Sequence, residues 1–334
     1  MPLNVLITAG SRRVPLVRAF AEAVRKAGGG TVIVTDVNAL SPAVHVADRA
    51  FEVPLATEPG YLDALELICR EEQIGLLVPT IDDELEAIGA ARDRFEAQGI
   101  RVAASPARTA AICNDKHRTC HYLRECGVPA AESWLPEDLP SAPQLPLFVK
   151  PRGGRGGVGA FPARTAAELA FFVGYLDAPV VQEYLDGPEF TIDMVCDRGR
   201  PIAVVPRERV VIRAGVMDRG RTVRDPALID LAQACAAVLE FDGAVNIQCR
   251  TRRDGSRAVF EINPRFSGGI PLTIAAGADF AGAIVQSALG RHVPAAIGDY
   301  TDGLWMTSYE TGIFIPDAQA HQLAPHPAAE RVLA

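Results

Sequence analysis

The first 105 residues alternate short apolar runs with longer amphipathic segments, and this alternation constrains the fold more than any other feature. The apolar runs, each long enough for one strand, are 5–7, 32–34, 76–78 and 101–103. The segments between them with apolar residues at helical spacing are 14–27, 60–72 and 83–98. Strands that alternate with helices are typical of a parallel sheet covered on both faces. We therefore predict a doubly wound, Rossmann-like α/β domain at residues 1–105.

Polar residues follow these strands and indicate a binding edge. In doubly wound sheets, ligands bind at the carboxyl ends of the strands. The first turn, 8–13, has one glycine instead of GxGxxG, so the dinucleotide fingerprint is missing. The residues at this edge that could contact a small-molecule substrate are Gly10, Arg12, Arg13, Asp36, Asp82 and Glu84. Helix capping and ordinary surface charge would explain the same residues equally well.

The pattern changes at Ser105-Pro106, which marks a domain boundary. Two short helices are expected at 107–113 and 115–126, followed by a proline-rich connector. The strands expected beyond it are 147–150, 179–184, 189–197, 201–213, 243–251 and 257–263, with helices near 165–174, 226–240 and 271–289. We predict an α+β half made of a small lobe at 106–180 and a large lobe at 181–315. The tail at 316–334 is expected to be poorly ordered.

Composition excludes several classes of protein. The net charge of −8 argues against a nucleic-acid binder that works through bulk electrostatics. No apolar run reaches 18 residues, so no membrane span is expected. The first residues already form a strand pattern without a basic leader, and seven scattered cysteines fit a reducing compartment. We expect a cytoplasmic enzyme with small-molecule partners and no nucleic-acid or membrane partner; a homodimer is compatible with the sequence.

Oxygen-bearing side chains cluster near the end of the α+β half. Glu261 and Asn263 are two residues apart, so they share one face of a strand, and Arg265 lies just beyond its end. If 244–248 forms a hairpin with this strand, Gln248 can join them. Three hard oxygen ligands suit Mg²⁺ or Mn²⁺, completed by phosphate oxygens. In isolation, a polar strand end explains these residues equally well.

A glycine-rich loop with two lysines favours the metal interpretation. The chain has 30 arginines and three lysines, and Lys116 and Lys150 lie before and at the start of this loop. A compact ammonium suits a phosphate better than a planar guanidinium where space is narrow. The glycines that would let the backbone approach an anion are Gly153, Gly154, Gly156, Gly157 and Gly159.

A third segment could hold the rest of a nucleotide. The strand ending in Gln182, Glu183, Tyr184 and Leu185 can offer extended main chain to a purine edge, and Glu189 could accept hydrogen bonds from ribose hydroxyls. The three segments thus offer contacts to the phosphates, the metal ion, the base and the sugar of a nucleotide. We expect one nucleotide, with its divalent cations, to lie between two lobes of the molecule.

These motifs occur in the order found in ATP-grasp enzymes, and residues 106–290 resemble that superfamily. The segments that carry the resemblance are Asn114-Asp115-Lys116, Val149-Lys150-Pro151, the glycine-rich loop, 182–189, 246–248 and 261–265. Many members carry an acid at the position of Gln248. A glutamine at this position makes the motif most similar to that of the large-subunit branch of the carbamoyl phosphate synthetases. Residues 1–105 resemble the pre-ATP-grasp domain. Because this chain is short and has a single ATP-grasp unit, it is more similar to stand-alone relatives, such as the lysine ligase of pyrrolysine biosynthesis, than to the long synthetases.

The resemblance implies a role for each matching residue. Lys116 and Lys150 would contact the α- and β-phosphates, while Gln182, Glu183 and Leu185 would hold adenine and Glu189 the ribose. Gln248, Glu261 and Asn263 would bind magnesium. Arg265 would steady the transferred phosphoryl group, assisted by a basic residue for which Arg207 and Arg213 are both candidates. Gly268 and Gly269 would let substrate approach the backbone, or would only loosen a helix start.

The implied activity is that of an ATP-dependent carboxylate–amine ligase. A carboxylate would attack the γ-phosphate of ATP, and an amine would displace phosphate from the acyl phosphate. A kinase or carbamoyl-phosphate-type phosphotransferase would use the same ATP and magnesium site, and a silent nucleotide-binding module is a third class. We expect the acceptor pocket between the first domain and the α+β half. A run of arginines at 207–224 either lines that cavity or forms a solvated face.

Overall fold

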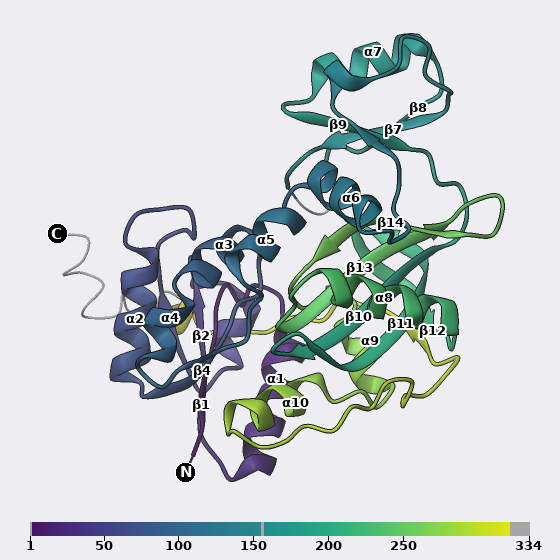
Figure 1. Cartoon of the computed structure of the whole chain (residues 1–334). Coiled ribbons are helices and arrows are strands. Elements are labelled where there is room, and N and C mark those ends of the chain that lie inside the picture. Colours follow the sequence, from purple (N-terminus) through teal and green to yellow (C-terminus); the bar gives the residue numbers. More distant parts are fainter. Residues whose placement is uncertain (1, 155–156, 321–334) are drawn as a thin grey trace.

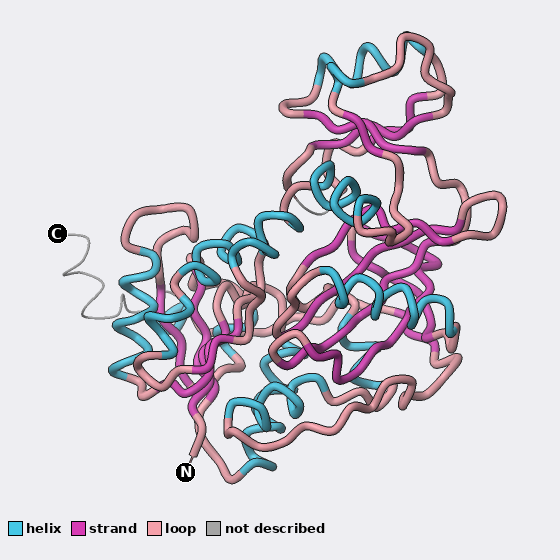
Figure 2. The backbone as a smooth tube through the Cα atoms, in the orientation of Figure 1, coloured by secondary structure: helices cyan, strands magenta, loops and turns pink. Residues whose placement is uncertain are grey.

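The computed structural model describes residues 2–154 and 157–320, which form three β-sheets with helices packed between and around them (Figure 1). Figure 2 shows the three groups of strands well separated in space. The expected fold class, an α/β domain followed by an α+β fold, is confirmed. The domain limits at residues 105, 180 and 315 stay a prediction.

The first sheet has five parallel strands in the order β3-β2-β1-β4-β5. The strands are β1 (Asn4–Ile7), β2 (Val32–Asp36), β3 (Arg49–Glu52), β4 (Ile74–Val78) and β5 (Arg101–Val102). The helices of this region are α1 (Val14–Ala27), α2 (Tyr61–Glu71), α3 (Asp82–Ala90) and α4 (Arg92–Glu96), with a short 3₁₀ turn at Pro42–His45. Apolar residues alternate between the two faces of β1, because successive side chains of a strand point in opposite directions. This alternation lets α1 pack on one face and α2 and α4 on the other.

The second sheet is small and antiparallel, in the order β6-β9-β7-β8. Its strands are β6 (Ser133–Trp134), β7 (Leu147–Pro151), β8 (Phe161–Ala163) and β9 (Pro179–Glu183). Helix α7 (Ala166–Tyr175) packs on it and begins with a capping box, in which the side chains of Thr165 and Glu168 accept from each other's backbone N–H groups. Helices α5 (Ala107–Cys113) and α6 (Lys116–Glu125) connect the first sheet to this one, and a short 3₁₀ turn occupies Pro136–Asp138.

The third sheet is antiparallel and has the order β14-β13-β10-β11-β12-β15. Its strands are β10 (Glu189–Asp197), β11 (Arg200–Arg213), β12 (Val216–Thr222), β13 (Gly243–Thr251), β14 (Arg257–Asn263) and β15 (Trp305–Thr307). Helix α8 (Pro226–Val238) covers one face together with α6, while α9 (Ile270–Ala275) and α10 (Phe280–Ala288) lie on the other side. The far end of this second face is polar and faces the small sheet.

Two predicted helices are divided in the structure. The segment expected as one helix at 271–289 forms α9 and α10, because Gly277 has a left-handed φ of 99° and Asp279 caps the second helix through Gly282 N. The segment at 83–98 forms α3 and α4, with Ala91 between them. The strands that sequence analysis missed are β3, β6, β8, β12 and β15, most of which are short or lie at sheet edges.

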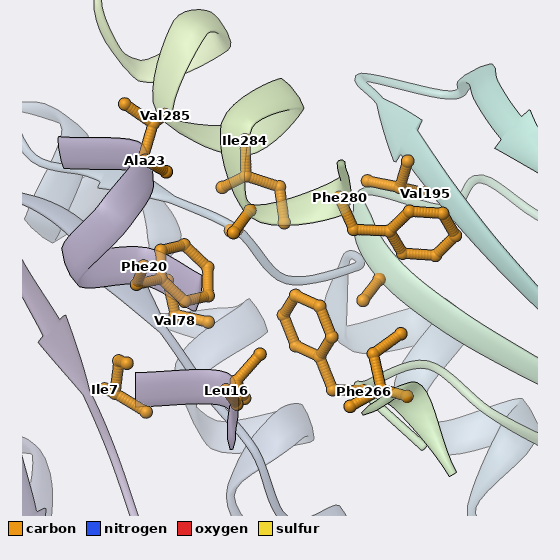
Figure 3. Packing of buried hydrophobic residues seen from close by; sticks show 14 of the residues in the cluster. Ile7, Leu16, Phe20, Ala23, Val78, Val195, Phe266, Phe280, Ile284 and Val285 are labelled. Carbon is orange, nitrogen blue, oxygen red and sulfur yellow. The ribbon is translucent and has the colours of Figure 1, made fainter. Parts of the chain in front are cut away.

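One apolar cluster joins the first sheet to the third. Helix α1 contributes Phe20, which meets Phe266 edge-on with ring centroids 5.8 Å apart. Figure 3 shows these two rings beside Phe280 and Ile284 of α10. Because Phe266 lies three residues after the end of β14, this core fixes the chain beyond that strand against the parallel-sheet domain.

Two expectations concern the rest of the chain. The tail predicted at 316–334 begins with a short helix, α11 (Asp317–Ala320), and its remainder lies outside the described residues. Within the described part of the chain, no helix has the length and apolar character needed to cross a membrane.

Candidate active site

A cavity of about 310 Å³ lies between the small sheet and the polar end of the large sheet. It is lined by residues from α6, β7, the glycine-rich loop, the β9–β10 connection, β11, β13 and β14. The candidate site residues that line it are Lys116, Lys150, Gly153, Gly154, Gly157, Gln182, Glu183, Tyr184, Leu185, Glu189, Gln248 and Glu261. Gly156 lies outside the described residues. None of the described residues before 106 lines this cavity.

The three candidate metal ligands lie together on β13 and β14. Gln248 is the direct cross-strand partner of Glu261, and Asn246 is the partner of Asn263, so all four side chains share one face. Asn263 Nδ2 donates to Glu261 Oε1 at 3.2 Å. Asn263 is buried, and Gln248 and Glu261 line the cavity. The hairpin expected from the sequence is therefore present.

Hard oxygen donors make this group suitable for Mg²⁺. It offers one carboxylate and the oxygens of two amides, and no thiol or imidazole. No group of three His, Cys, Asp or Glu side chains that could hold a metal occurs in the part of the chain that the structure describes. An oxygen-ligated cation that completes its shell with water and phosphate fits the donor set.

Lys150 enters the cavity from β7, and the metal group (Gln248, Glu261 and Asn263) lies on β13 and β14. Its Nζ donates to Phe260 O at 3.3 Å and lies 5.0 Å from the centre of the Phe260 ring. Burial lowers the pKa of Lys150 to about 8, although the negative charge of Glu261 acts in the opposite direction. No ion pair of Lys150 is formed within the part of the chain that the structure describes, and its ammonium faces the cavity, where it can bind an anion.

Lys116 holds the glycine-rich loop. It is the first residue of α6, and its buried Nζ donates to Gly154 O at 2.8 Å and to Gly153 O at 3.3 Å. Gly154 and Gly157 have φ values of 85° and 67°, in the left-handed region that favours glycine. The sequence thus provides both the lysine and the residues that allow the loop to curve around it. An ammonium has three N–H donors, so Lys116 can also reach a ligand.

The segment between β9 and β10 forms one wall of the cavity. Gln182 is buried and its Nε2 donates to Cys120 Sγ at 3.2 Å, while Glu183 pairs with Arg252 at 2.6 Å. Tyr184 and Leu185 continue this wall. A larger hollow of about 800 Å³ lies on the other side of the same segment, next to the proline-rich connector.

Glu189 accepts hydrogen bonds from Arg209, a member of the arginine run for which lining the cavity was one alternative, and from Arg250, which sequence analysis did not assign to the site. Arg209 Nη1 lies 2.5 Å from Glu189 Oε1, and Arg250 Nε donates to Glu189 Oε2 at 3.0 Å. Arg209 also donates to Gly215 O and reaches within 3.4 Å of Gln248 Oε1. The arginine run at 207–224 was the sequence signal for Arg209, whereas Arg250 comes opposite Glu189 only through the β10–β13 pairing.

Neither of the two arginines proposed from the sequence lines the cavity. Arg207 is 1% exposed and forms a two-pronged ion pair with Asp193 at 2.8 and 3.0 Å. Gly269 leaves room for this guanidinium, because a Cβ there would lie 2.4 Å from Arg207 Nη1. Arg213 is exposed and pairs with Glu310 at 2.8 Å. Gly268 lies against Val216, where an added Cβ would be 3.0 Å from the valine.

Arg265 is held by the parallel-sheet domain. Its Nη2 lies 2.7 Å from Asp82 Oδ2, its Nε contacts both oxygens of the same carboxylate, and Nη2 also lies 3.3 Å from Asn263 Oδ1. Arg265 does not line the cavity, but it contacts one of the three candidate metal ligands. The structure therefore brings Asp82, which the sequence placed at the substrate edge, next to the metal group.

The other residues of the substrate edge are mostly engaged within their own domain. Glu84 is fully buried and accepts from Thr80 N at 2.7 Å and Ile81 N at 3.0 Å; burial raises its pKa. It caps α3 and does not face solvent. Asp36 accepts from Ser11 N at 2.6 Å. Gly10 packs so closely that a Cβ would lie 2.5 Å from Val34, and Arg12 is exposed.

Two family models match successive parts of the chain. Residues 5–103 match the PylC-like N-terminal domain, and residues 176–312 match a family described as ATP-grasp in the biosynthetic pathway with Ter operon. Residues 176–312 belong to the ATP-grasp superfamily. The match at 176–312 includes the β9–β10 wall and the metal group, whereas Lys116, Lys150 and the glycine-rich loop lie outside it.

Relatives and solved structures agree with the ATP-grasp assignment. The chain is 28% identical over 308 residues to the arginine-specific carbamoyl phosphate synthase large chain of Geobacillus stearothermophilus, covering 86% of this chain and 29% of that protein. It thus spans less than a third of the first such relatives. An L-amino acid ligase from Bacillus licheniformis shares the fold with a TM-score of 0.68 and 19% identity, over 86% of this chain and 74% of that one. An ADP complex of N5-carboxyaminoimidazole synthetase from Staphylococcus aureus has a TM-score of 0.70 and 15% identity, over 88% and 79%.

Proposed function

We propose that this protein is an ATP-dependent ligase that activates a carboxylate as an acyl phosphate and joins it to an amine. The observation that carries this proposal is one cavity with Lys116 and Lys150 on one side and Gln248 and Glu261 on the other. Two lysines that face oxygen ligands able to hold a divalent cation suit a polyphosphate, and the ATP-grasp assignment makes ATP the expected donor.

The lysines and the wall between β9 and β10 would bind the nucleotide. Lys150 would donate to a phosphate oxygen, and Lys116 would do the same while holding the glycine-rich loop in place. The main chain of 183–185 and the side chain of Gln182 would contact adenine. Glu189 would accept from ribose, since a carboxylate has more lone pairs than its two arginine partners occupy.

Gln248, Glu261 and Asn263 would hold Mg²⁺ or Mn²⁺. A bound divalent cation would neutralise charge on the phosphates during transfer. The residues of the chain would position the reactants and exclude water. Arg209 is the arginine on β11 that lines the cavity, and we assign to it the phosphate contact for which Arg207 and Arg213 were candidates. Arg265 would act at the rim, near Asn263.

The proposed reaction has two steps. A carboxylate oxygen of the acid forms a bond to the γ-phosphorus, and the bond from that phosphorus to the bridging oxygen breaks, releasing ADP. The amine nitrogen then attacks the acyl carbon, the carbon–oxygen bond to phosphate breaks, and the nitrogen loses a proton. Most of the rate enhancement in such transfers comes from positioning and charge stabilisation.

Oxygen labelling tests this route. The full chain would be incubated with ATP, Mg²⁺ and mixtures of amino acids whose carboxylates carry ¹⁸O, and ADP, amide and phosphate would be measured. We expect ADP formation to depend on both an acid and an amine, and one ¹⁸O atom to appear in the released phosphate. An amide formed without transfer of ¹⁸O to phosphate, or with AMP as product, would overturn the acyl-phosphate route.

A phosphotransferase is the second candidate, because the curated relative above is a carbamoyl phosphate synthase. Such an enzyme would use the same cavity and stop after the first step. Its product would be a phosphorylated acid, formed without an amine and detectable by trapping with hydroxylamine. A stable phosphorylated product with no amide in any amine mixture would favour this candidate over the ligase.

A further inference from the structure

We propose that Asp82 is a positioning residue for the candidate metal site, acting from the parallel-sheet domain through Arg265 on the amide of Asn263. This inference rests on the proposed function only in assuming that Gln248, Glu261 and Asn263 bind a divalent cation. It gives Asp82 a role other than the substrate contact expected from the sequence.

The pair joins residues that are 183 positions apart in the chain. Arg265 Nε and Nη2 face the carboxylate of Asp82 at 3.0 and 2.7 Å, and both side chains are largely buried, 13% and 14% exposed. A guanidinium held by two N–H groups in this way has a fixed plane as well as a fixed position. Asp82, together with Phe266 O, which accepts from Arg265 Nη1 at 3.1 Å, therefore fixes where the N–H groups of Arg265 point.

One of these N–H groups points at Asn263. Arg265 Nη2 lies 3.3 Å from Asn263 Oδ1, and Asn263 Nδ2 in turn lies 3.2 Å from Glu261 Oε1. An arginine can only donate and an ionised carboxylate can only accept, so the amide of Asn263 has one orientation in this network. Its oxygen, the atom able to ligate a cation, is the end that Arg265 holds.

Both ends of this connection are rigid. Asp82 is the first residue of α3, whose start is capped by the buried carboxylate of Glu84, and Asn114 Nδ2 donates to Asp82 O at 3.2 Å. On the other side, Phe266 is anchored against Phe20 in the shared apolar cluster (Figure 3). Arg13 ties the two sides together, since it donates to Thr80 O at 2.7 Å and to Phe266 O at 3.1 Å.

Hydrogen-bond partners behind the ligands affect metal binding strongly. Removing such a partner costs about 10–100-fold in metal affinity or activity in known sites. Without the carboxylate of Asp82, Phe266 O alone holds the guanidinium against rotation, and the donor that orients the oxygen of Asn263 loses its fixed position. The parallel-sheet domain thus contributes to metal affinity although none of its described residues lines the cavity.

The test is a Mn²⁺ titration of the full chain with a non-hydrolysable ATP analogue, followed by electron paramagnetic resonance. Asp82→Asn and Asp82→Ser should each weaken Mn²⁺ binding about tenfold or more, whereas Asp82→Glu should recover part of the affinity. Glu86→Gln is the matched control, because Glu86 is an exposed acid on the same helix. Thermal unfolding of each variant would show which of them are folded.

Weaker Mn²⁺ binding in folded Asp82 variants, with an unchanged Glu86→Gln control, would support the inference. A Mn²⁺ affinity within twofold of that of the unmodified protein, in either Asp82→Asn or Asp82→Ser, would overturn the inference. The ion pair would then serve only to hold the two domains together. The outcome is separable from the proposed function, because the titration measures binding and not ligation. A chain that binds Mn²⁺ in this Asp82-dependent way but forms no amide would contradict the ligase proposal alone.

Discussion

Gln248 on β13 lies directly opposite Glu261 on β14, so the two side chains leave the sheet next to each other and enter the same cavity. Glu261 is the carboxylate of the three candidate metal ligands. Glu261→Gln keeps the size of the side chain and removes its charge. We expect turnover of ATP to fall by about 10²-fold or more, the size of effect produced by losing a group that stabilises transition-state charge.

Acceptor-stimulated ADP release at saturating ATP and Mg²⁺ measures this effect. Glu240→Gln serves as the control, because Glu240 is an exposed acid beyond the end of α8. A Glu261→Gln protein that turns over ATP at a near-native rate would refute the assignment of Glu261 to the metal group.

The lowered pKa of Lys150 predicts proton uptake on nucleotide binding. Its pKa is about 8, so a large share of the free protein carries a neutral amine at pH 8.5. A bound phosphate favours the charged form and raises that pKa. Calorimetry of MgADP binding in two buffers with different ionisation enthalpies should show an uptake of up to about one proton at pH 8.5, and less at pH 7. Affinity should decrease as the pH rises above 8.

Lys150→Arg is the comparison for this experiment. A guanidinium keeps its charge throughout this pH range, so the proton uptake should disappear. The planar fork is also larger than the ammonium it replaces beside Phe260, and we expect weaker MgADP binding at every pH. Equal proton uptake in both proteins would assign the titration to another group.

Arg209 and Arg213 should differ in their effect on nucleotide binding. Arg209 lines the cavity and contacts Glu189, whereas Arg213 is exposed and pairs with Glu310. Arg209→Met should weaken MgADP binding by about 10-fold or more, because hydrogen bonds to charged groups contribute about 1.5–3 kcal/mol. Arg213→Met should bind within about twofold of the unmodified protein, since surface ion pairs contribute about 0–1 kcal/mol. The reverse ranking in calorimetry would contradict the proposed assignment.

Asp242 should be important for stability and not for binding. Its buried carboxylate pairs with Arg101 at 2.6 Å and with Arg92 at 2.7 Å, and so joins the large sheet to the parallel-sheet domain. Removing one partner of a buried ion pair typically costs about 3–5 kcal/mol. Asp242→Asn should lower the free energy of unfolding by that order, measured by urea denaturation at pH 7.

Asp242 also makes the free energy of unfolding depend on pH, and the direction of this dependence follows from its pKa. Burial alone would raise the pKa of Asp242, but hydrogen bonds from Arg101 and Arg92 leave it below its ordinary value. Its stabilisation is therefore present above the ordinary carboxyl pKa of about 3.9 and is lost as the pH falls toward the folded value. The stability difference between the unmodified protein and Asp242→Asn should shrink below about pH 4. A constant difference down to pH 2 would exclude this linkage.

Local patterns in the sequence predicted most of the strands and the composition of the candidate site. Side chains two residues apart on a strand share a face, which is why the spacing of Glu261 and Asn263 predicted their proximity. The run of glycines marked the loop, in which Gly154 and Gly157 adopt the left-handed φ that glycine allows. These features depend on neighbours close in the chain, so the sequence alone determined them.

Contacts between distant residues were decided only by the tertiary structure. Arg207 and Arg209 occupy the same face of β11, yet the second lines the cavity while the first is enclosed by Asp193, Ser267 and Gly269, which come from distant parts of the chain. Glu84 caps its helix although its sequence position also suited a substrate edge. The Asp82–Arg265 pair depends on how two domains pack, and hydrophobic periodicity carries no information about which charged residues that packing brings together.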